Sequence, residues 1–119
     1  MESILQSIRK MVLGNSDDTH FDTDIIIHIN SVFSDLNEMG VGPETTFSID
    51  DDSTVWSEFT DSDALFNKVK TYMYLRVRLI FDPPTNSSVL AAMERQASEL
   101  EWRLTVSASN KAMEETENE

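Results

Sequence analysis

Apolar side chains recur at helical spacing in four segments of the chain, and each segment is bounded by residues that stop helices. The first segment covers residues 4–13 and is followed by Gly14. The second covers about residues 22–39, with Asp22 or Thr23 as its N-cap, and is followed by Gly40. Glycine just past the last apolar position is typical of a helix C-terminus, because it adopts a positive φ without a Cβ clash. We therefore predict a short helix followed by a long one.

Two more long helices are predicted in the second half of the chain. One runs over about residues 61–81 and stops before Pro83, since proline has no amide hydrogen to donate and restricts the residue before it. The other starts at Thr85 or Asn86. Its apolar residues form a narrow seam that suits packing along one neighbouring helix. They are Leu90, Met93, Ala97, Leu100 and Leu104.

The segment from residue 43 to residue 60 has no helical repeat, and two conformations fit it equally well. Apolar and polar residues alternate over residues 46–49 and three aspartates follow, which is typical of a short β-hairpin. A loop that leads into one helical turn between Trp56 and Phe59 fits the same residues.

The whole pattern predicts an all-α fold: a small bundle of three long helices plus a short N-terminal helix, with an irregular loop or small β-hairpin at about 43–60. The length of 119 residues suits one domain, which we place at residues 1–106. The apolar repeat fades from about Ser107, so we predict an acidic, disordered tail at 107–119. No apolar run approaches the roughly 20 residues that span a bilayer, and we expect no contact with a membrane.

Negative charge is concentrated in one half of the chain. The formal net charge is −13, and the stretch between Lys10 and Lys68 holds 13 carboxylates without one lysine or arginine. The remaining residues hold 9 acidic and 9 basic side chains, which cancel. Tight binding to nucleic-acid phosphates is therefore not expected. An acidic surface of this kind keeps a protein soluble, repels DNA or meets a basic partner.

No pattern typical of catalysis or metal binding is present in the sequence. The chain lacks cysteine, a glycine-rich phosphate loop and a nucleophile motif. Four residues fall at ligand positions of a calcium-binding loop: Asp50, Asp52, Thr54 and Asp61. The sixth position of that loop is Val55, where the sharp turn needs glycine. His20 and His28, the two histidines, match no metal-binding spacing. We therefore expect no enzyme activity, no metal and no cofactor.

Five residues are candidate interface residues. Trp102 lies nine positions after Met93, or about 180° around the helix, so it faces away from the apolar seam. A large aromatic residue off the seam is a candidate interface anchor, unless a second layer of the protein covers it. Trp56, in the irregular segment, has the same two interpretations. The other candidates are basic and suit either an acidic neighbour or ion pairs within the chain: Arg76, Arg78 and Arg103.

Six short stretches, taken in order, resemble a known family. They are residues 24–30 (DIIIHIN), 40–43 (GVGP), 56–59 (WSEF), 69–75 (VKTYMYL), 78–84 (RLIFDPP) and 101–104 (EWRL). In their order and spacing they resemble the small head-tail connector (adaptor) proteins of siphophages from Gram-positive hosts, over roughly residues 3–106.

This resemblance implies a structural protein that assembles as a ring, usually a dodecamer, beneath the portal protein of a tailed phage. The ring extends the DNA channel, lets DNA pass without specific binding, and offers a platform for the stopper or tail-completion protein. The protein would lie at the head-tail interface of the virion, and in the host cytoplasm during assembly. In such a ring, Asp50, Asp51 and Asp52 are the candidates for an acidic lumen or docking loop.

Two other functions fit the charge pattern and stay open at this point. One is an acidic protein that mimics DNA and inhibits a basic host protein. The other is a generic helical adaptor in a different complex.

Overall fold

The protomer is a helical bundle with one loop-rich segment. The computed structural model describes residues 2–15 and 17–117. Within these ranges the helices are α1 (Ile4–Leu13), α2 (Asp22–Met39), α3 (Trp56–Phe59), α4 (Asp63–Phe81) and α5 (Ser87–Glu117). The described residues contain no strand, and Ser3 and Val55 form an isolated antiparallel bridge. The prediction of an all-α fold is confirmed.

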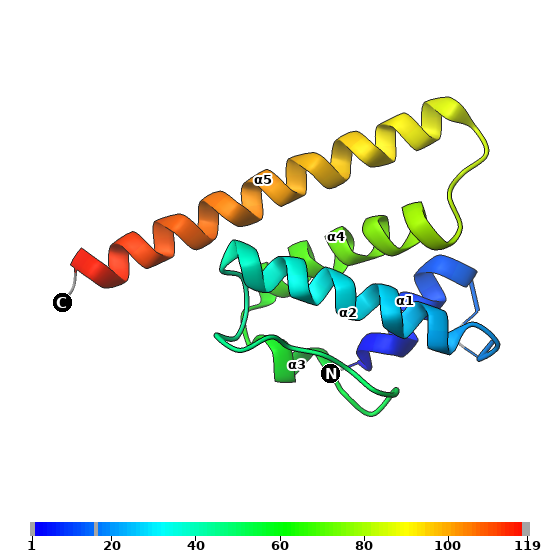
Figure 1. Cartoon of the computed structure of the whole chain (residues 1–119), viewed down its shortest axis with the longest axis horizontal. Helices are drawn as coiled ribbons and strands as arrows, with labels where there is room; N and C mark the ends of the chain where they lie inside the picture. The colour runs from blue at the N-terminus through cyan, green and yellow to red at the C-terminus, as the bar shows by residue number, and fades with distance from the viewer. Residues whose placement is uncertain (1, 16, 118–119) are drawn as a thin grey trace.

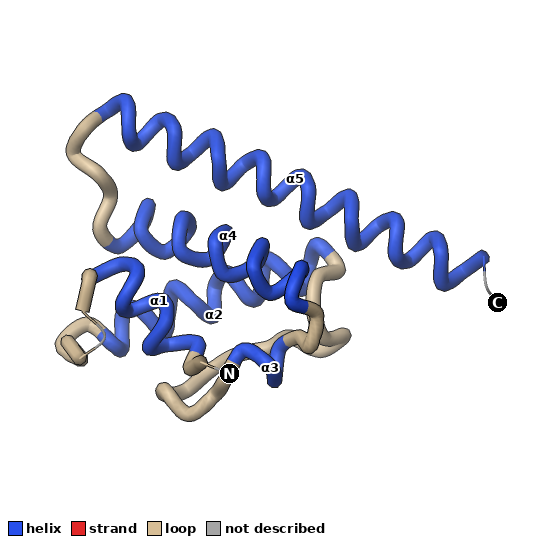
Figure 2. Tube along the Cα trace, turned by 180° about the vertical axis from the view of Figure 1, so that it is seen from behind, coloured by secondary structure: helices blue, strands red, loops and turns tan. Residues whose placement is uncertain are grey.

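Helix α4 lies at the centre of the bundle and contacts α1, α2 and α5. Helices α1 and α2 pack on one side of it, and α5 runs back along its other side (Figures 1 and 2). The C-terminal end of α5 extends past the rest of the protomer (Figure 1). Much of the surface of α5 is therefore left without a partner from its own chain.

The helix boundaries follow the predicted stop and start residues, except at the start of α2 and at the end of α5. Gly14 and Gly40 end α1 and α2 with φ of 75° and 84°. The hydroxyl of Ser62 accepts a hydrogen bond from the Leu65 amide, and the side chain of Asn86 caps the start of α5. Neither predicted N-cap of α2 acts as one, since the cap position is Phe21.

Residues 43–60 form a loop and one helical turn, so the β-hairpin alternative is wrong. In a hairpin, a partner strand would form hydrogen bonds with the N–H and C=O groups of Ile49. Here the side-chain amide of Asn30 forms both hydrogen bonds instead. The Asn30 Nδ2 donates to the Ile49 carbonyl at 2.9 Å, and the Ile49 amide donates to Asn30 Oδ1 at 2.8 Å. Two turns further along α2, Asn37 donates to the carbonyls of Pro43 and Glu44. The loop is thus held on the surface of α2.

Trp56 is part of the hydrophobic core, which corrects its prediction as an interface residue. Its side chain is 0% exposed, and its indole Nε1 donates to the Ser7 hydroxyl at 2.9 Å. Its ring packs on the rings of Phe33, Phe59 and Phe66, with centroids 5.5–6.5 Å away. A side chain buried in this way offers no surface to another protein.

The C-terminal segment differs from the predicted disordered tail, because α5 stays helical to Glu117. The packed seam of this helix continues to Leu104, which is buried, and to Ala108 beside the core. The following residues include Lys111, Ala112 and Met113, which favour helix without needing a packing partner. The apolar repeat therefore predicted which part of α5 packs on the protomer, but it did not predict the residue at which the helix ends. The final residues 118 and 119 lie outside the described residues.

Replacing Trp56 by alanine should lower the free energy of unfolding by about 3–5 kcal/mol, because it removes a fully buried aromatic side chain. The other tryptophan provides the control. Trp102 is 66% exposed, so Trp102→Ala should change the free energy of unfolding by less than about 0.5 kcal/mol. Urea denaturation followed by far-ultraviolet circular dichroism measures both, and equal effects would contradict the assignment of Trp56 to the core.

Candidate interaction surfaces

The three consecutive aspartates Asp50, Asp51 and Asp52, called here the acidic loop, are exposed. The segment that carries them lies across the protomer from α5 (Figures 1 and 2). Asp52 Oδ2 accepts a hydrogen bond of 3.1 Å from the side chain of Gln6, which ties the acidic loop to α1. The acidic loop is therefore a charged surface of defined position.

Asp51 is held in its charged form by its own turn. Asp51 Oδ1 accepts hydrogen bonds from the Ser53 hydroxyl at 2.5 Å and from the Ser53 amide at 2.9 Å. These two bonds hold the pKa of the Asp51 carboxyl below its ordinary value. The negative charge of this residue thus persists at neutral and mildly acidic pH.

Arg76 links three helices inside the protomer. Its Nη2 donates to Asp35 Oδ2 on α2 at 2.7 Å, and its Nη1 donates to the Tyr72 hydroxyl at 2.6 Å. The Tyr72 hydroxyl in turn donates to Glu101 Oε2 on α5 at 3.2 Å. Burial raises the pKa of this hydroxyl above its ordinary value, so it keeps the proton that it donates. Of the two interpretations of Arg76, the geometry favours an ion pair with the acidic half of its own chain.

The other two basic candidates differ in how far they are engaged. Arg78 is partly exposed. It donates hydrogen bonds to the Tyr74 hydroxyl at 3.1 Å and to the Asp82 carbonyl at 3.3 Å, and both partners lie at the C-terminal end of α4. Arg103 lies on the surface of α5, where it pairs with Glu99 at 2.5 Å and both side chains are 56% exposed. Arg103 therefore presents its charge to solvent, and its role at an interface stays a prediction.

Trp102 lies on the side of α5 that points away from the protomer, as its spacing predicts. It is 66% exposed, whereas Leu104 on the opposite side of the helix is 0% exposed. Several residues share this side within about 40° of rotation, and we call the four with the largest side chains the outer face of α5. They are Arg95, Trp102, Val106 and Met113. An aromatic residue exposed to this extent at the centre of such a face is a candidate anchor for another protein.

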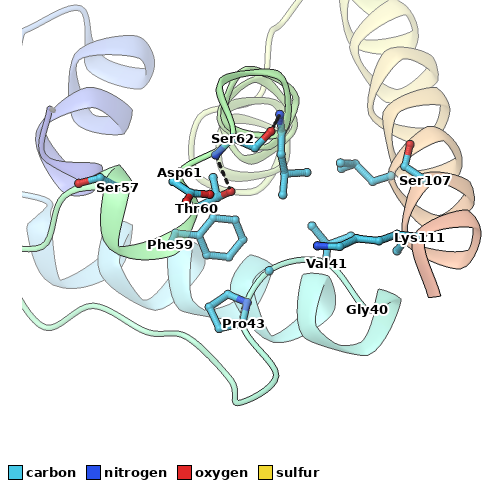
Figure 3. A pocket seen from close by; sticks show the side chains of 14 residues that line it. Gly40, Val41, Pro43, Ser57, Phe59, Thr60, Asp61, Ser62, Ser107 and Lys111 are labelled. Atoms are coloured by element: carbon cyan, nitrogen blue, oxygen red, sulfur yellow. Dashed lines mark hydrogen bonds between the residues drawn. The ribbon is translucent and has the colours of Figure 1, made fainter. Parts of the chain in front are cut away.

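A half-open pocket of about 590 Å³ lies between α5 and the ends of α2 and α3, and we call it the Phe59 pocket (Figure 3). Its apolar wall is made by Val41, Pro43, Phe59, Leu65, Leu104 and Ala108. Its polar rim is made by Ser57, Thr60, Asp61, Ser62, Ser107 and Lys111. Figure 3 shows the Phe59 ring facing the side chain of Lys111 across this space. An apolar wall with a polar rim suits a ligand group that is itself apolar with one polar edge.

Gly42 shapes the Phe59 pocket. It has a φ of 92°, and a Cβ added there would lie 2.4 Å from the Phe59 ring. Only glycine allows both the backbone conformation and this close approach. In the sequence, Gly40 predicted a helix stop and residues 40–43 formed part of the family resemblance, but no pocket was predicted there. The signal that was present is a second glycine two residues after the helix C-cap.

The described residues contain neither a candidate metal site nor a helix suited to cross a membrane. No group of three or more His, Cys, Asp or Glu side chains there is placed to hold a metal ion. None of the helices in the described ranges is both long enough and apolar enough to cross a membrane.

The chain belongs to the phage connector protein family. The family model described as phage connector protein matches residues 4–111. No curated protein and no solved structure matches the chain. The predicted resemblance to head-tail connectors is confirmed by this match, which extends five residues past the boundary that we placed at residue 106. The protein is thus a structural component of a phage virion that connects head to tail and contacts other phage proteins. The predicted Gram-positive host stays a prediction.

The link made by Arg76 can be measured with a double-mutant cycle. Combining Asp35→Ala with Arg76→Ala should show a coupling energy of about 1–2 kcal/mol, because the pair is hydrogen-bonded and partly buried. The exposed pair of Glu99 and Arg103 is the matched control, with an expected coupling energy of at most about 0.5 kcal/mol. Urea denaturation of the single and double variants gives both values. A coupling energy near zero for Asp35 and Arg76 would free Arg76 for the interface role.

Proposed function

We propose that the protein assembles as a ring, a dodecamer by family resemblance, beneath the portal protein. The ring would extend the DNA channel and form the platform for the stopper or tail-completion protein. The observation that carries this proposal is the match to the phage connector family over residues 4–111. Its role is structural, without catalysis, metal or cofactor, at the head-tail interface of the virion after assembly in the host cytoplasm.

The uneven distribution of charge supports this assembly. A ring is built from heterologous contacts, in which two different patches of each subunit meet. The loop segment that carries the acidic loop lies across the protomer from α5 (Figure 1), and Trp102 on the outer face of α5 is 66% exposed. These surfaces differ in charge and in apolar character, so one orientation of each subunit relative to its neighbours is favoured over the reverse.

The acidic loop is proposed to face the DNA channel. DNA must slide through the ring, so a surface that binds phosphates would slow it. Two of the carboxylates in the acidic half of the chain are neutralised by buried or partly buried arginines, Asp22 by Arg9 and Asp35 by Arg76. The aspartates of the acidic loop instead point their charge to solvent, which suits a lumen that repels DNA.

Mass measured by light scattering on a sizing column tests the assembly. The protein alone and mixed with the portal protein of the same phage are compared. We expect the mixture to form a large complex of defined stoichiometry that contains both proteins. A protein that stays monomeric and ignores its portal would contradict the proposal and favour the DNA mimic or the generic adaptor.

Neutralising the acidic loop with Asp50→Asn, Asp51→Asn and Asp52→Asn tests the lumen. We expect the variant to join the portal normally but to slow the release of DNA from filled heads, because the channel no longer repels phosphates. Asp17→Asn, Glu94→Gln and Glu114→Gln remove the same charge from other exposed positions and should leave the rate unchanged. Equal release rates for the wild type and the acidic-loop variant would rule out the lumen position.

A further inference from the structure

We infer that Trp102 of one copy inserts into the Phe59 pocket of the next copy in the ring. This inference rests on the proposed ring and names the contact that joins its subunits. Trp102 is 66% exposed, and the Phe59 pocket has an apolar wall and a polar rim that suit an aromatic side chain with one polar edge.

The chemistry of the Phe59 pocket fits an indole ring. Its volume of about 590 Å³ lies in the range of pockets that hold small molecules, so there is room for a bicyclic side chain. The partly exposed side chains of Pro43, Leu65 and Ala108 supply the apolar surface that the indole ring needs. The indole N–H also needs an acceptor when it leaves water. The carboxylate of Asp61 on the rim can accept that hydrogen bond.

The surroundings of Trp102 and the rim of the Phe59 pocket each carry one positive and one negative side chain, so their charges can pair. Trp102 has Arg103 beside it and Glu99 one helical turn before it, and both are exposed. The rim of the Phe59 pocket carries Asp61 and Lys111. An arginine that meets an aspartate and a glutamate that meets a lysine favour this pairing and disfavour the reversed orientation of the subunit.

Trp102 and the Phe59 pocket of one chain face different directions, so the contact between them requires a second copy of the chain. The pocket residues on α5 are Leu104, Ser107, Ala108 and Lys111. They lie about 120–180° around the helix from Trp102, so Trp102 cannot reach the pocket of its own chain. Two complementary surfaces that face in nearly opposite directions join head to tail, and a small rotation at each contact closes the chain of subunits into a ring.

Cysteine cross-linking tests the contact, because the chain contains no cysteine of its own. Arg103→Cys and Asp61→Cys proteins are mixed, assembled with the portal and oxidised. We expect a disulfide-linked dimer of the two variants in the assembled ring and much less of it in the unassembled mixture. Lys10→Cys is the matched control, since Lys10 is exposed on α1, and it should not cross-link to Asp61→Cys.

Fluorescence quenching by acrylamide follows the burial of Trp102 itself. Trp56 is already buried in the protomer, so a loss of quenching on assembly reports Trp102. Trp102→Phe serves as the reference for the signal of Trp56. We expect the quenchable fraction of the wild type to fall to the level of the Trp102→Phe variant.

Blocking the contact from either side should weaken assembly. Trp102→Ala should raise the protein concentration needed for ring formation by roughly tenfold or more, as removal of a central aromatic anchor does. Ser107→Trp fills the pocket from its exposed rim and should have the same effect. Ser31→Trp places the same side chain on an exposed position of α2 and should assemble as the wild type does.

The outcomes separate this inference from the proposed function. Assembly with the portal without the cross-link overturns the inference and leaves the ring standing. The same holds if Trp102 becomes protected from acrylamide but no cross-link forms, because the portal would then cover it. Failure of the wild type to assemble with the portal overturns both. Cross-linking and protection together support the contact.

Discussion

The burial of Trp56 is the interaction on which the rest of the protomer depends. Its indole N–H is satisfied by Ser7 of α1, and its ring packs on Phe33 of α2 and Phe66 of α4. One side chain from a connecting segment therefore joins three helices that are far apart in the sequence. The backbone repeats the connection, because the Ile4 amide donates to the Thr54 carbonyl and the Trp56 amide donates to the Glu2 carbonyl. Without this anchor, the long loop between α2 and α4 would be held on α2 by Asn30 and Asn37 but would lose its side-chain link to α1 and α4.

Local signals predicted the helices, because glycine, serine and asparagine act within one turn of the chain. The same reasoning failed where the outcome depends on distant residues. The alternation over residues 46–49 suits a strand, but Asn30 already supplies the donor and the acceptor that a strand partner would give to Ile49. For Trp56, an aromatic residue in an irregular segment is compatible with core or interface, and only its contact with α1 decides. The Phe59 pocket was missed for the same reason, since its walls come from three separate segments.

The few basic residues of the chain are used in a way that shapes its surface. Arg9 is 3% exposed and binds Asp22 at the start of α2 through two hydrogen bonds. Arg76 binds Asp35 near the end of the same helix. Both arginines thus neutralise carboxylates at positions where the helices pack. Because an unpaired charge is costly to bury, a buried arginine must keep its carboxylate partner. The aspartates of the acidic loop, in contrast, are exposed to solvent. The acidic surface is therefore a consequence of how the core is held together as well as of composition.

Helix α5 connects the stability of the protomer with the proposed contact between subunits. One side of it packs on α4 through Ala97 and Leu104, and this side belongs to the core. The same stretch of helix carries Trp102 on the opposite side and lines the Phe59 pocket with Ser107 and Lys111. A shift or rotation of α5 relative to α4 would therefore move the anchor and reshape the pocket together. A subunit that has not packed α5 on α4 would lack the pocket wall that α5 supplies, so the proposed contact between subunits requires a folded protomer.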